Sequence, residues 1–196
     1  MSFFDNFVSA AKPIVTCDKI PGLENFDATR YMGSWIEIQH VTGEYFQPDS
    51  WKCNQALYTD LDKDGNFKVY NSSQYSISPR FGVHGHAKCP AGEALGHCWV
   101  TFFGQPWLPI PNYQIIDTDY ETYSIIYACQ ENSTQALLWF MSRTPTMDPA
   151  TLLHVQSRAR AILPNFDFSQ MVVDLQGDEH GCKYATEKSV SESFLF

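Results

Sequence analysis

The chain has 196 residues, a formal net charge of −9 and an aromatic content of 15%. Its length suits a single domain with its own hydrophobic core. An acidic chain is a poor match for nucleic acid or an anionic membrane surface, because both attract clustered Lys and Arg. No apolar run approaches the roughly 20 residues that a membrane-spanning helix needs.

The first 16 residues do not resemble a signal peptide. They lack a basic start, and Asp5 and Asn6 interrupt their apolar residues. We therefore interpret the chain as a mature form, or as one to which a starting Met has been added, in which residues 1–16 are an N-terminal extension. Residues 17–184 are predicted to form one domain, and residues 185–196 a flexible tail.

Short strands separated by turn signals dominate the middle of the chain. Typical turn signals are Asp62-Lys-Asp-Gly65 and Ser78-Pro79. The predicted strands are 34–41, 53–60, 66–76, 82–89, 98–103, 112–117, 123–129 and 136–142. Eight antiparallel strands in sequential order favour an all-β fold, an up-and-down β-barrel that has no unpaired edges.

One α-helix is predicted at residues 149–163, followed by a short strand near 170–175. Asp148 is suited to the N-cap, and Pro149 to the first helical position. Pro164 ends the helix. The helix carries an apolar stripe, which predicts packing against the outside of the barrel.

Six cysteines are spread along the chain. An even number in this pattern favours three disulfides and an oxidising compartment. Six cysteines allow many pairings, and the sequence alone does not choose among them. No Cys-x-x-Cys pair or Cys/His zinc spacing occurs, so we predict no metal site.

Three short motifs point to a known family. The stretch 25–35, Asn-Phe-Asp-x-x-x-Tyr-x-Gly-x-Trp, resembles the first signature of the lipocalins. Thr118-Asp119-Tyr120 and Arg143 resemble the two later signatures, at the expected places in the strand order. Within this family, the stretches 67–73 and 117–129 look most like apolipoprotein D, the insect bilin-binding proteins such as insecticyanin, and the crustacyanins.

The signature residues are interpreted as structural. Gly33 permits a tight backbone at the barrel floor, and Trp35 plugs that floor. Arg143 is expected to lie on the indole and to donate to backbone carbonyls. Asp119 is expected to accept backbone N–H groups in its turn. The structural set is Gly33, Trp35, Thr118, Asp119, Tyr120 and Arg143.

The resemblance also implies disulfide pairing. By the family's pattern Cys17 pairs with Cys129, and Cys53 with Cys182. Cys89 and Cys98 are then left over, and a bridge between them would close a local hairpin.

Strand alternation predicts which side chains point into the barrel. Together with the resemblance, it gives a ligand-binding set of Glu37, Gln39, Tyr58, Val69, Asn71, Ser73, Tyr75, Tyr113, Ile115, Tyr127, Leu137, Trp139 and Met141, to which His84 and His86 are added as candidates at the barrel mouth. A mainly apolar and aromatic lining suits an elongated hydrophobic ligand. The resemblance implies that Asn71 contacts ligand and that Trp139 forms an aromatic wall. Leu137 stands where the bilin binders have a histidine.

His84 and His86 share one face of a predicted strand. Three roles are open for them: hydrogen bonds to a pigment at the barrel mouth, a metal pair, or a solvated edge. Asn71 and Asn132 each begin a glycosylation sequon. Because Asn71 is expected to point inward, Asn132 is the predicted acceptor.

The resemblance implies a secreted, extracellular protein that carries or sequesters a small hydrophobic ligand. We expect a pigment, either a linear tetrapyrrole such as biliverdin or a carotenoid such as astaxanthin. The alternative is a carrier of fatty acid, steroid or retinoid, as in apolipoprotein D. We expect no catalytic cofactor.

Two further classes remain open. An isomerase of the prostaglandin D synthase type needs a free thiol inside the barrel. We expect all six cysteines to be paired and therefore no enzyme. A homo- or hetero-oligomer of lipocalin subunits is the other class, because Phe46, Trp51, Phe81 and Trp107 lie in predicted loops.

Overall fold

The structure is a computed structural model that describes residues 16–43, 47–76, 78–90, 95–129 and 135–193. The expected N-terminal extension, up to residue 15, lies outside the described residues, as do Phe46 and Asn132.

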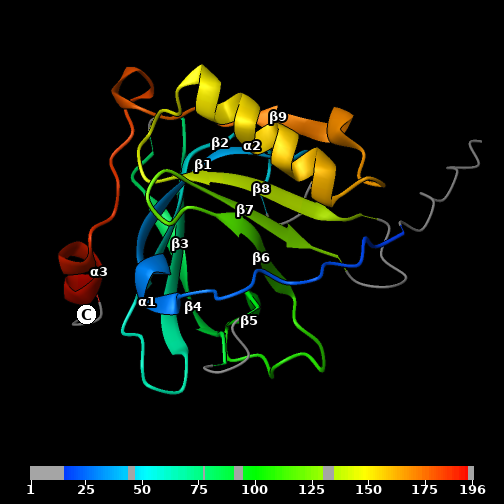
Figure 1. Cartoon of the computed structure of the whole chain (residues 1–196). Helices are drawn as coiled ribbons and strands as arrows, with labels where there is room; N and C mark the ends of the chain where they lie inside the picture. Colours follow the sequence, from blue (N-terminus) through cyan, green and yellow to red (C-terminus); the bar gives the residue numbers. More distant parts are fainter. Residues whose placement is uncertain (1–15, 44–46, 77, 91–94, 130–134, 194–196) are drawn as a thin grey trace, which may run out of the picture.

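Eight antiparallel strands form a barrel in which each strand pairs with its neighbours in the sequence (Figure 1). The strands are β1 (Gly33–Val41), β2 (Trp51–Thr59), β3 (Asn66–Tyr75), β4 (Phe81–Lys88), β5 (His97–Phe102), β6 (Tyr113–Thr118), β7 (Tyr123–Ala128) and β8 (Leu137–Ser142). Each boundary falls within two residues of the sequence prediction. The predicted fold class is confirmed.

Strand β1 closes the barrel by pairing on both sides. One side pairs with β8. The other side pairs with β2 from Gly33 to Ile36, and then with the short strand β9 (Met171–Val173) from Gln39 to Val41. The chain beyond β9 therefore enters the barrel wall between β1 and β2, where the backbone N–H of Cys53 donates to the carbonyl of Leu175.

Helix α2 (Pro149–Ile162) covers the outside of the barrel and contacts β6 and β7 (Figure 1). The Asp148 carboxylate accepts the N–H groups of Ala150 and Thr151 at 3.1 and 3.0 Å, which confirms the predicted cap. Val155 and Ala159 are fully buried on the face that packs against the barrel. The apolar stripe thus packs where the sequence predicted.

Apolar side chains form two separate clusters. One lies inside the barrel and contains Phe26, Tyr31, Trp35, Ala56, Tyr58, Phe67, Val69, Ala87, Cys89, Cys98, Ile115, Ile126 and Met141. The other lies between the barrel and α2 and contains Ile116, Tyr123, Ile125, Tyr127, Leu138, Phe140, Val155, Ala159 and Leu163. Membership of these clusters tells which face of each strand a residue occupies.

The end of the barrel where β1 begins is closed by packed and hydrogen-bonded side chains. Trp35 is fully buried, and its indole N–H donates to the Tyr31 carbonyl of helix α1 (Ala28–Tyr31) at 2.9 Å. The Arg143 guanidinium lies 3.7 Å from the Trp35 ring centroid and donates to the carbonyls of Ser34 and Tyr120. Gly33 has φ of +93°, a conformation that a side chain would strain. These predicted structural roles are confirmed.

The turn between β6 and β7 is also built as predicted. The Asp119 carboxylate accepts the backbone N–H groups of Glu121, Thr122 and Tyr123. The Thr118 hydroxyl donates to the Tyr123 carbonyl, and the Tyr120 hydroxyl accepts the backbone N–H of Asp27. This turn therefore links α1 to the ends of β6 and β7 at the closed end of the barrel.

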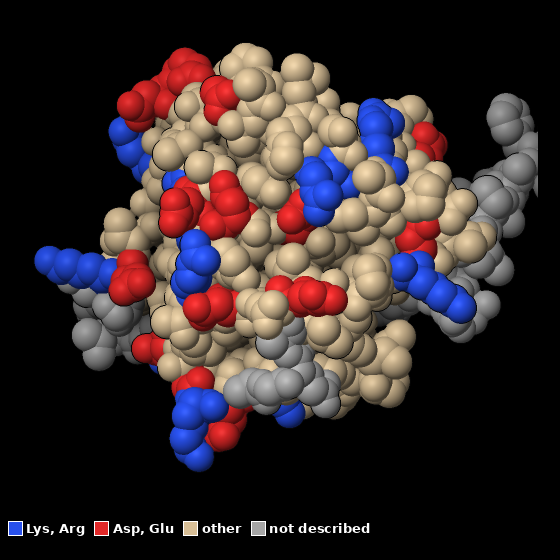
Figure 2. All heavy atoms as spheres, in the orientation of Figure 1, with Lys and Arg blue, Asp and Glu red and all other residues tan. Residues whose placement is uncertain are grey.

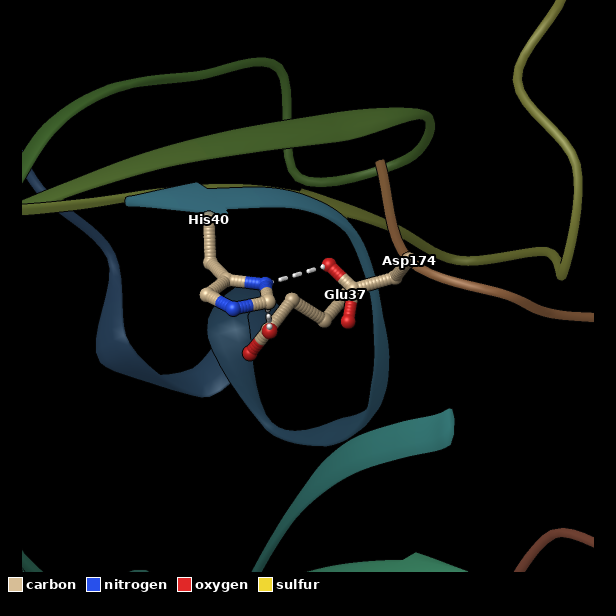
Figure 3. A group of neighbouring side chains, drawn as sticks. All are labelled: Glu37, His40 and Asp174. Atoms are coloured by element: carbon tan, nitrogen blue, oxygen red, sulfur yellow. Dashed lines mark hydrogen bonds and ion pairs between the residues drawn. The ribbon is translucent and has the colours of Figure 1, made fainter. Parts of the chain in front are cut away.

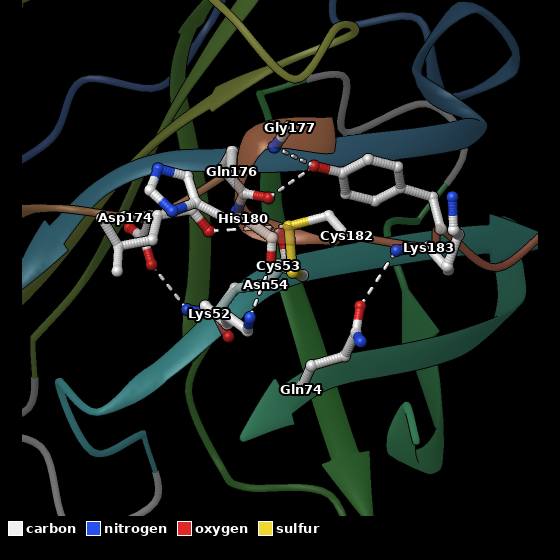
Figure 4. Close-up of a disulfide and its surroundings, with 12 residues drawn as sticks. Lys52, Cys53, Asn54, Gln74, Asp174, Gln176, Gly177, His180, Cys182 and Lys183 are labelled. Atoms are coloured by element: carbon white, nitrogen blue, oxygen red, sulfur yellow. Dashed lines mark hydrogen bonds between the residues drawn. A yellow bond between two sulfur atoms is a disulfide. The ribbon is translucent and has the colours of Figure 1, made fainter. Parts of the chain in front are cut away.

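All six cysteines form the three predicted disulfides, Cys17–Cys129, Cys53–Cys182 and Cys89–Cys98. The first holds the start of the domain against the end of β7. Figure 4 shows the second, which ties the segment after β9 to β2. Hydrogen bonds from Lys183 to Gln74 and from Lys52 to His180 surround it.

Several short helices were not predicted. Two 3₁₀ turns, η1 (Phe168–Gln170) and η2 (Asp178–His180), flank β9. Helix α3 (Glu187–Ser193) forms within the segment that the sequence analysis assigned to a tail. Within the described residues, no helix is both long and apolar enough to cross a membrane. On the face shown in Figure 2, Lys and Arg side chains are scattered among Asp and Glu.

Candidate ligand-binding site

The register of the strands defines the inner wall of the barrel. Trp35 of β1 lies opposite Ala56 of β2, which lies opposite Asn71 of β3, which in turn lies opposite Val83 of β4. Directly paired residues share a face of the sheet. Because Trp35 and Ala56 belong to the interior cluster, Asn71 and Val83 also face inward.

This inner wall is reachable by solvent above the closed end. Asn71 is exposed although it lies in the middle of a strand. The inward apolar side chains Val83, Phe102 and Trp139 are only partly buried. An apolar wall with one accessible amide provides what a hydrophobic ligand needs: area to bury and a group that fixes orientation.

Three tyrosines form a hydroxyl network at the base of this wall. The Tyr58 and Tyr113 hydroxyls lie 2.6 Å apart, and the Tyr31 hydroxyl lies 3.4 Å from Tyr113 and 3.0 Å from the hydroxyl of Ser124. Burial raises the pKa of Tyr31 to about 12, and it holds the pKa of Tyr58 and of Tyr113 well above the usual range. All three phenols are therefore neutral at physiological pH, and each retains an O–H that can donate.

A buried polar cluster lies in the wall where β9 meets β1 (Figure 3). The Nδ1 atom of His40 is 2.9 Å from Asp174 Oδ2 and 3.2 Å from Glu37 Oε1. Burial and the charge of Asp174 raise the pKa of Glu37 to about 8. Burial lowers the pKa of His40, but the hydrogen bonds to Asp174 and Glu37 outweigh it and raise the pKa to about 11.

Gln47 connects this cluster to the aromatic wall. Its amide donates to Glu37 Oε1, and its carbonyl oxygen accepts the indole N–H of Trp139 at 3.3 Å. The Glu37 carboxylate is thus engaged within the cluster, although Glu37 lies on the inner face as predicted. Ligand at the Trp139 wall would lie one residue away from the cluster.

Most of the predicted ligand-binding residues do face inward. By cluster membership or by register, these are Glu37, Tyr58, Val69, Asn71, Ser73, Tyr113, Ile115, Leu137, Trp139 and Met141. Contact with a ligand stays a prediction for each of them. Tyr75 is at the rim, opposite Trp51 at the end of β3, and its side chain is 53% exposed.

The inward prediction for Gln39 is wrong. A β-bulge lies between Glu37 and Gln39 and shifts the alternation of β1 by one residue. Gln39 consequently pairs with Phe140 of the outer cluster and accepts a hydrogen bond from Gln156 of α2 at 3.2 Å. His40 takes the inward position instead, opposite Trp139.

The inward prediction for Tyr127 is also wrong. Tyr127 belongs to the cluster beneath α2, and its hydroxyl accepts the backbone N–H of Asp18. The opposite parity of β7 points inward, with Ser124 bonded to Tyr31 and Ile126 in the interior cluster. Every residue from Tyr123 to Tyr127 is buried, so hydrophobic alternation could not choose a face.

His84 and His86 lie on the outer face of β4, which rules out their predicted place in the ligand lining. His84 pairs with Tyr70 and its ring lies 4.7 Å from the Tyr70 ring, while His86 pairs with Lys68. Both histidines line a groove between the outside of β2–β4 and helix α3. In the sequence, Gly82 and Gly85 left their face open to either interpretation.

Sequence reasoning missed His40, Ser124 and Asp174 as inward or clustered polar groups. His40 was hidden by the bulge, and Ser124 by the uniform burial of β7. Asp174 comes from a strand of three residues whose insertion beside β1 has no local signal. The buried pair of His40 and Asp174 lies far apart in sequence, so it can be recognised only once the strand topology is known.

Comparisons with known proteins agree with this architecture. A family model described as a lipocalin-like domain matches residues 26–176. Apolipoprotein D of Mus musculus is 30% identical over 143 residues, covering 71% of this chain and 72% of that protein. The Lazarillo protein of Schistocerca americana is 26% identical over 157 residues, covering 77% of this chain and 71% of that protein.

Solved structures show the same fold. Insecticyanin from the tobacco hornworm Manduca sexta has a TM-score of 0.71 at 22% identity, with 89% of this chain and 93% of that chain covered. Lobster apocrustacyanin A1 has a TM-score of 0.66 at 17% identity, with coverage of 84% and 90%. At these identities the likeness concerns the fold of the chain.

Proposed function

This chain belongs to the lipocalin-like family, and we propose that it carries or sequesters a pigment inside its barrel. The pigment class is a linear tetrapyrrole such as biliverdin or a carotenoid such as astaxanthin. The observation that carries the proposal is the exposure of Asn71 in the middle of a mainly apolar and aromatic inner wall. Loops at the open end would set access to the wall.

The chemistry of the wall supports a long conjugated ligand. Phe102, Tyr113 and Trp139 are inward aromatic side chains that remain partly accessible. Their rings can stack on a flat or extended π-system. Neutral tyrosine O–H groups below them can donate to a keto or lactam oxygen, which would also tune the colour of the pigment.

A colourless ligand is the second candidate. Leu137 occupies an inward position beside Trp139, so the wall lacks a histidine there, and this makes it more apolar. A fatty acid, steroid or retinoid would fit such a wall, and the chain is 30% identical to apolipoprotein D of Mus musculus over 143 residues. The two candidates share the site and differ in the ligand that fills it.

An isomerase that uses a barrel thiol is not favoured. Every cysteine of the chain is bonded to another, so the thiolate that such chemistry requires has no source in this oxidised form. The three disulfides also support the proposed extracellular location. Trp51 and Phe81, whose rings lie 4.8 Å apart at the rim, offer an aromatic surface for contact with another lipocalin subunit.

The test is a visible absorption spectrum of the natively purified protein, repeated after biliverdin and, separately, astaxanthin are added to ligand-free protein. We expect a shifted absorption band that saturates at one pigment per chain, with quenching of tryptophan fluorescence. Neither a band nor quenching with either pigment would contradict the pigment proposal. Saturable binding of a fatty acid, steroid or retinoid would then favour the second candidate.

Matched variants locate the bound pigment. Asn71→Leu and Trp139→Leu change the inner wall and are expected to weaken binding by about tenfold each, equal to about 1.4 kcal/mol. The double variant His84→Gln/His86→Gln changes the outer face of β4 and is the control, with unchanged affinity expected. Equal loss in the control would place the pigment outside the barrel.

A further inference from the structure

Four polar side chains from distant parts of the chain meet in the wall between β1 and β2. They are Glu37 and His40 of β1, Asn54 of β2, and Asp174, which follows β9. Figure 3 shows the His40 ring beside both carboxylates. All four side chains are buried, with residue exposures of 2% to 6%.

The cluster brings two buried carboxyl groups to one imidazole nitrogen. Nδ1 of His40 carries at most one proton, yet it faces the carboxylates of both Glu37 and Asp174. A third carboxylate, that of Asp49, lies 3.6 Å from Nε2 of the same ring. Among the described residues, the ion pairs of these three carboxylates are all with His40. When Glu37 and Asp174 are both ionised, the two buried carboxylates outnumber the one imidazolium, and a bound cation would balance the remaining charge.

The spacing of the ligand atoms suits a small divalent ion. One ligand atom each from Glu37, His40 and Asp174 lies within 4.8 Å of the others. His40 Nδ1 is 3.2 Å from Glu37 Oε1 and 2.9 Å from Asp174 Oδ2. Zinc bonds of about 2.0 Å in a tetrahedron place neighbouring ligands about 3.3 Å apart. The three donors are therefore close to coordination distance with only small side-chain shifts.

Asn54 offers a fourth donor atom beside these three. Its amide points into the cluster, with Nδ2 at 2.5 Å from Asp174 Oδ1 and 3.5 Å from Glu37 Oε1. Its Oδ1 atom is buried and has no hydrogen-bond partner. Rotation of the amide by half a turn exchanges the two atoms. The unpartnered oxygen could then coordinate a cation between the two carboxylates, in place of the hydrogen bonds that Nδ2 donates to them.

We propose that Glu37, His40 and Asp174, with Asn54 as a fourth ligand, form a binding site for a divalent transition-metal ion of the Zn²⁺ class. The donor set of one imidazole nitrogen and three oxygens fits borderline ions such as Zn²⁺. On binding, the ion takes the two carboxylates and neutral His40, and the protons that these groups held go to solvent. The site is formed by long-range contacts, which is why the ligand spacing in the sequence gave no sign of it.

The bound ion would hold three elements of the fold together. Ligands from β1, β2 and the segment after β9 would be joined through one ion, beside the Cys53–Cys182 disulfide (Figure 4). Gln47 links Glu37 to Trp139, so the ion would lie next to the aromatic inner wall. The metal site does not depend on the pigment proposal, since all its ligands come from the chain.

The test is calorimetric titration of the full, disulfide-bonded chain with Zn²⁺ alone, after treatment with a chelator. We expect one high-affinity ion per chain. Glu37→Gln and Asp174→Asn, which keep the shape of the side chains, are each expected to weaken binding at least tenfold. The double variant His84→Gln/His86→Gln is the matched control, because it removes the histidines of the outer face of β4, and unchanged affinity is expected.

A second readout distinguishes coordination from loose association. Co²⁺ in a site of low coordination number gives visible d–d bands, which we expect with the wild type and not with Glu37→Gln. Zn²⁺ should also raise the melting temperature of the wild type and of the control, but not of Glu37→Gln. If Glu37→Gln does not fold, as judged by circular dichroism, His40→Gln replaces it in all three measurements.

Three results would overturn the proposal. One is the absence of one-to-one Zn²⁺ binding to the wild type. Another is binding that the cluster variants leave intact. The third is binding that the outer-face double variant abolishes, which would assign the ion to His84 and His86. In any of these cases, the cluster serves only as a hydrogen-bonded contact between β9 and the barrel.

Discussion

Polar and aromatic residues occur at both ends of the barrel, but their surroundings differ. At the closed end, Arg143 lies on Trp35 and donates to backbone carbonyls, so its charge and its N–H groups are used within the fold. Toward the open end, Asn71 and the half-buried Trp139 form part of the accessible inner wall. Polar and aromatic groups whose contacts all lie within the protein stabilise the fold, whereas groups that remain accessible can contact a ligand.

The comparison separates stability from binding. Changes at the closed end should lower the free energy of unfolding, whereas changes on the inner wall should alter ligand affinity and leave the fold intact. The following variants are ordered by the size of the expected change in stability.

Arg143→Ala should have the largest effect. It removes the contact with Trp35 and leaves the carbonyls of Ser34, Tyr120 and Arg30 without their donor. We expect the free energy of unfolding to fall by about 3–4 kcal/mol, measured by urea denaturation. Arg143→Lys is the control and should recover only part of this loss, because one ammonium group cannot reach all of the carbonyls. Full recovery by Lys would show that charge alone matters there.

Removal of the Cys53–Cys182 disulfide should come next. The bond joins positions 129 residues apart, so its loss frees the unfolded chain considerably. We expect Cys53→Ser/Cys182→Ser to lose about 3 kcal/mol in the same measurement. Cys89→Ser/Cys98→Ser, which opens a separation of 9 residues, is the comparison and should lose less. The reverse order would indicate that local packing, and not chain entropy, decides the cost.

Asp119→Asn should lower stability by about 1 kcal/mol at neutral pH, a modest value because the residue is partly exposed to solvent. Partial burial favours the neutral acid, but hydrogen bonds from Thr122, Tyr123 and Glu121 hold the pKa of Asp119 below its usual range. Its stabilising contribution is therefore present above the usual carboxyl pKa of about 4 and is lost as the pH falls through the lower folded value. Unfolding curves of both proteins should converge in acid, and a constant difference down to low pH would be inconsistent with this account.

Asn71→Leu should change stability least, by about 0.5 kcal/mol or less, because the side chain is exposed on the inner wall. The same change is expected to weaken pigment binding about tenfold. Thermal unfolding of the ligand-free protein and a binding titration check both halves. A large loss of stability without any change in affinity would reverse the contrast between the two ends.

Local patterns were enough to predict the barrel, its strands and the closed end. Turn residues predicted the strand boundaries, and Asp148 and Pro149 predicted the start of α2. The motifs at Trp35 and Arg143 indicated the family, and the resemblance implied both the disulfide pairing and the closed floor of the barrel. Each of these features depends on short-range signals or on a resemblance that extends along the whole domain.

The faces of individual strands were harder to predict. A single extra residue in β1 turned Gln39 outward and His40 inward, and such a bulge leaves no mark on composition. Tyr127 was misplaced because both faces of β7 are buried, one in the barrel and the other beneath α2. Asp174 meets His40 only through the insertion of β9, a contact 134 residues apart in sequence.

Native mass spectrometry of the protein, purified without organic solvent, tests the central claim most directly. The account predicts one hydrophobic small molecule bound per chain, displaced by added biliverdin or astaxanthin and held less tightly by Asn71→Leu than by the His84→Gln/His86→Gln control. A chain that carries no small molecule and takes up neither of the pigments nor a fatty acid, steroid or retinoid would contradict the claim that the inner wall is a ligand site.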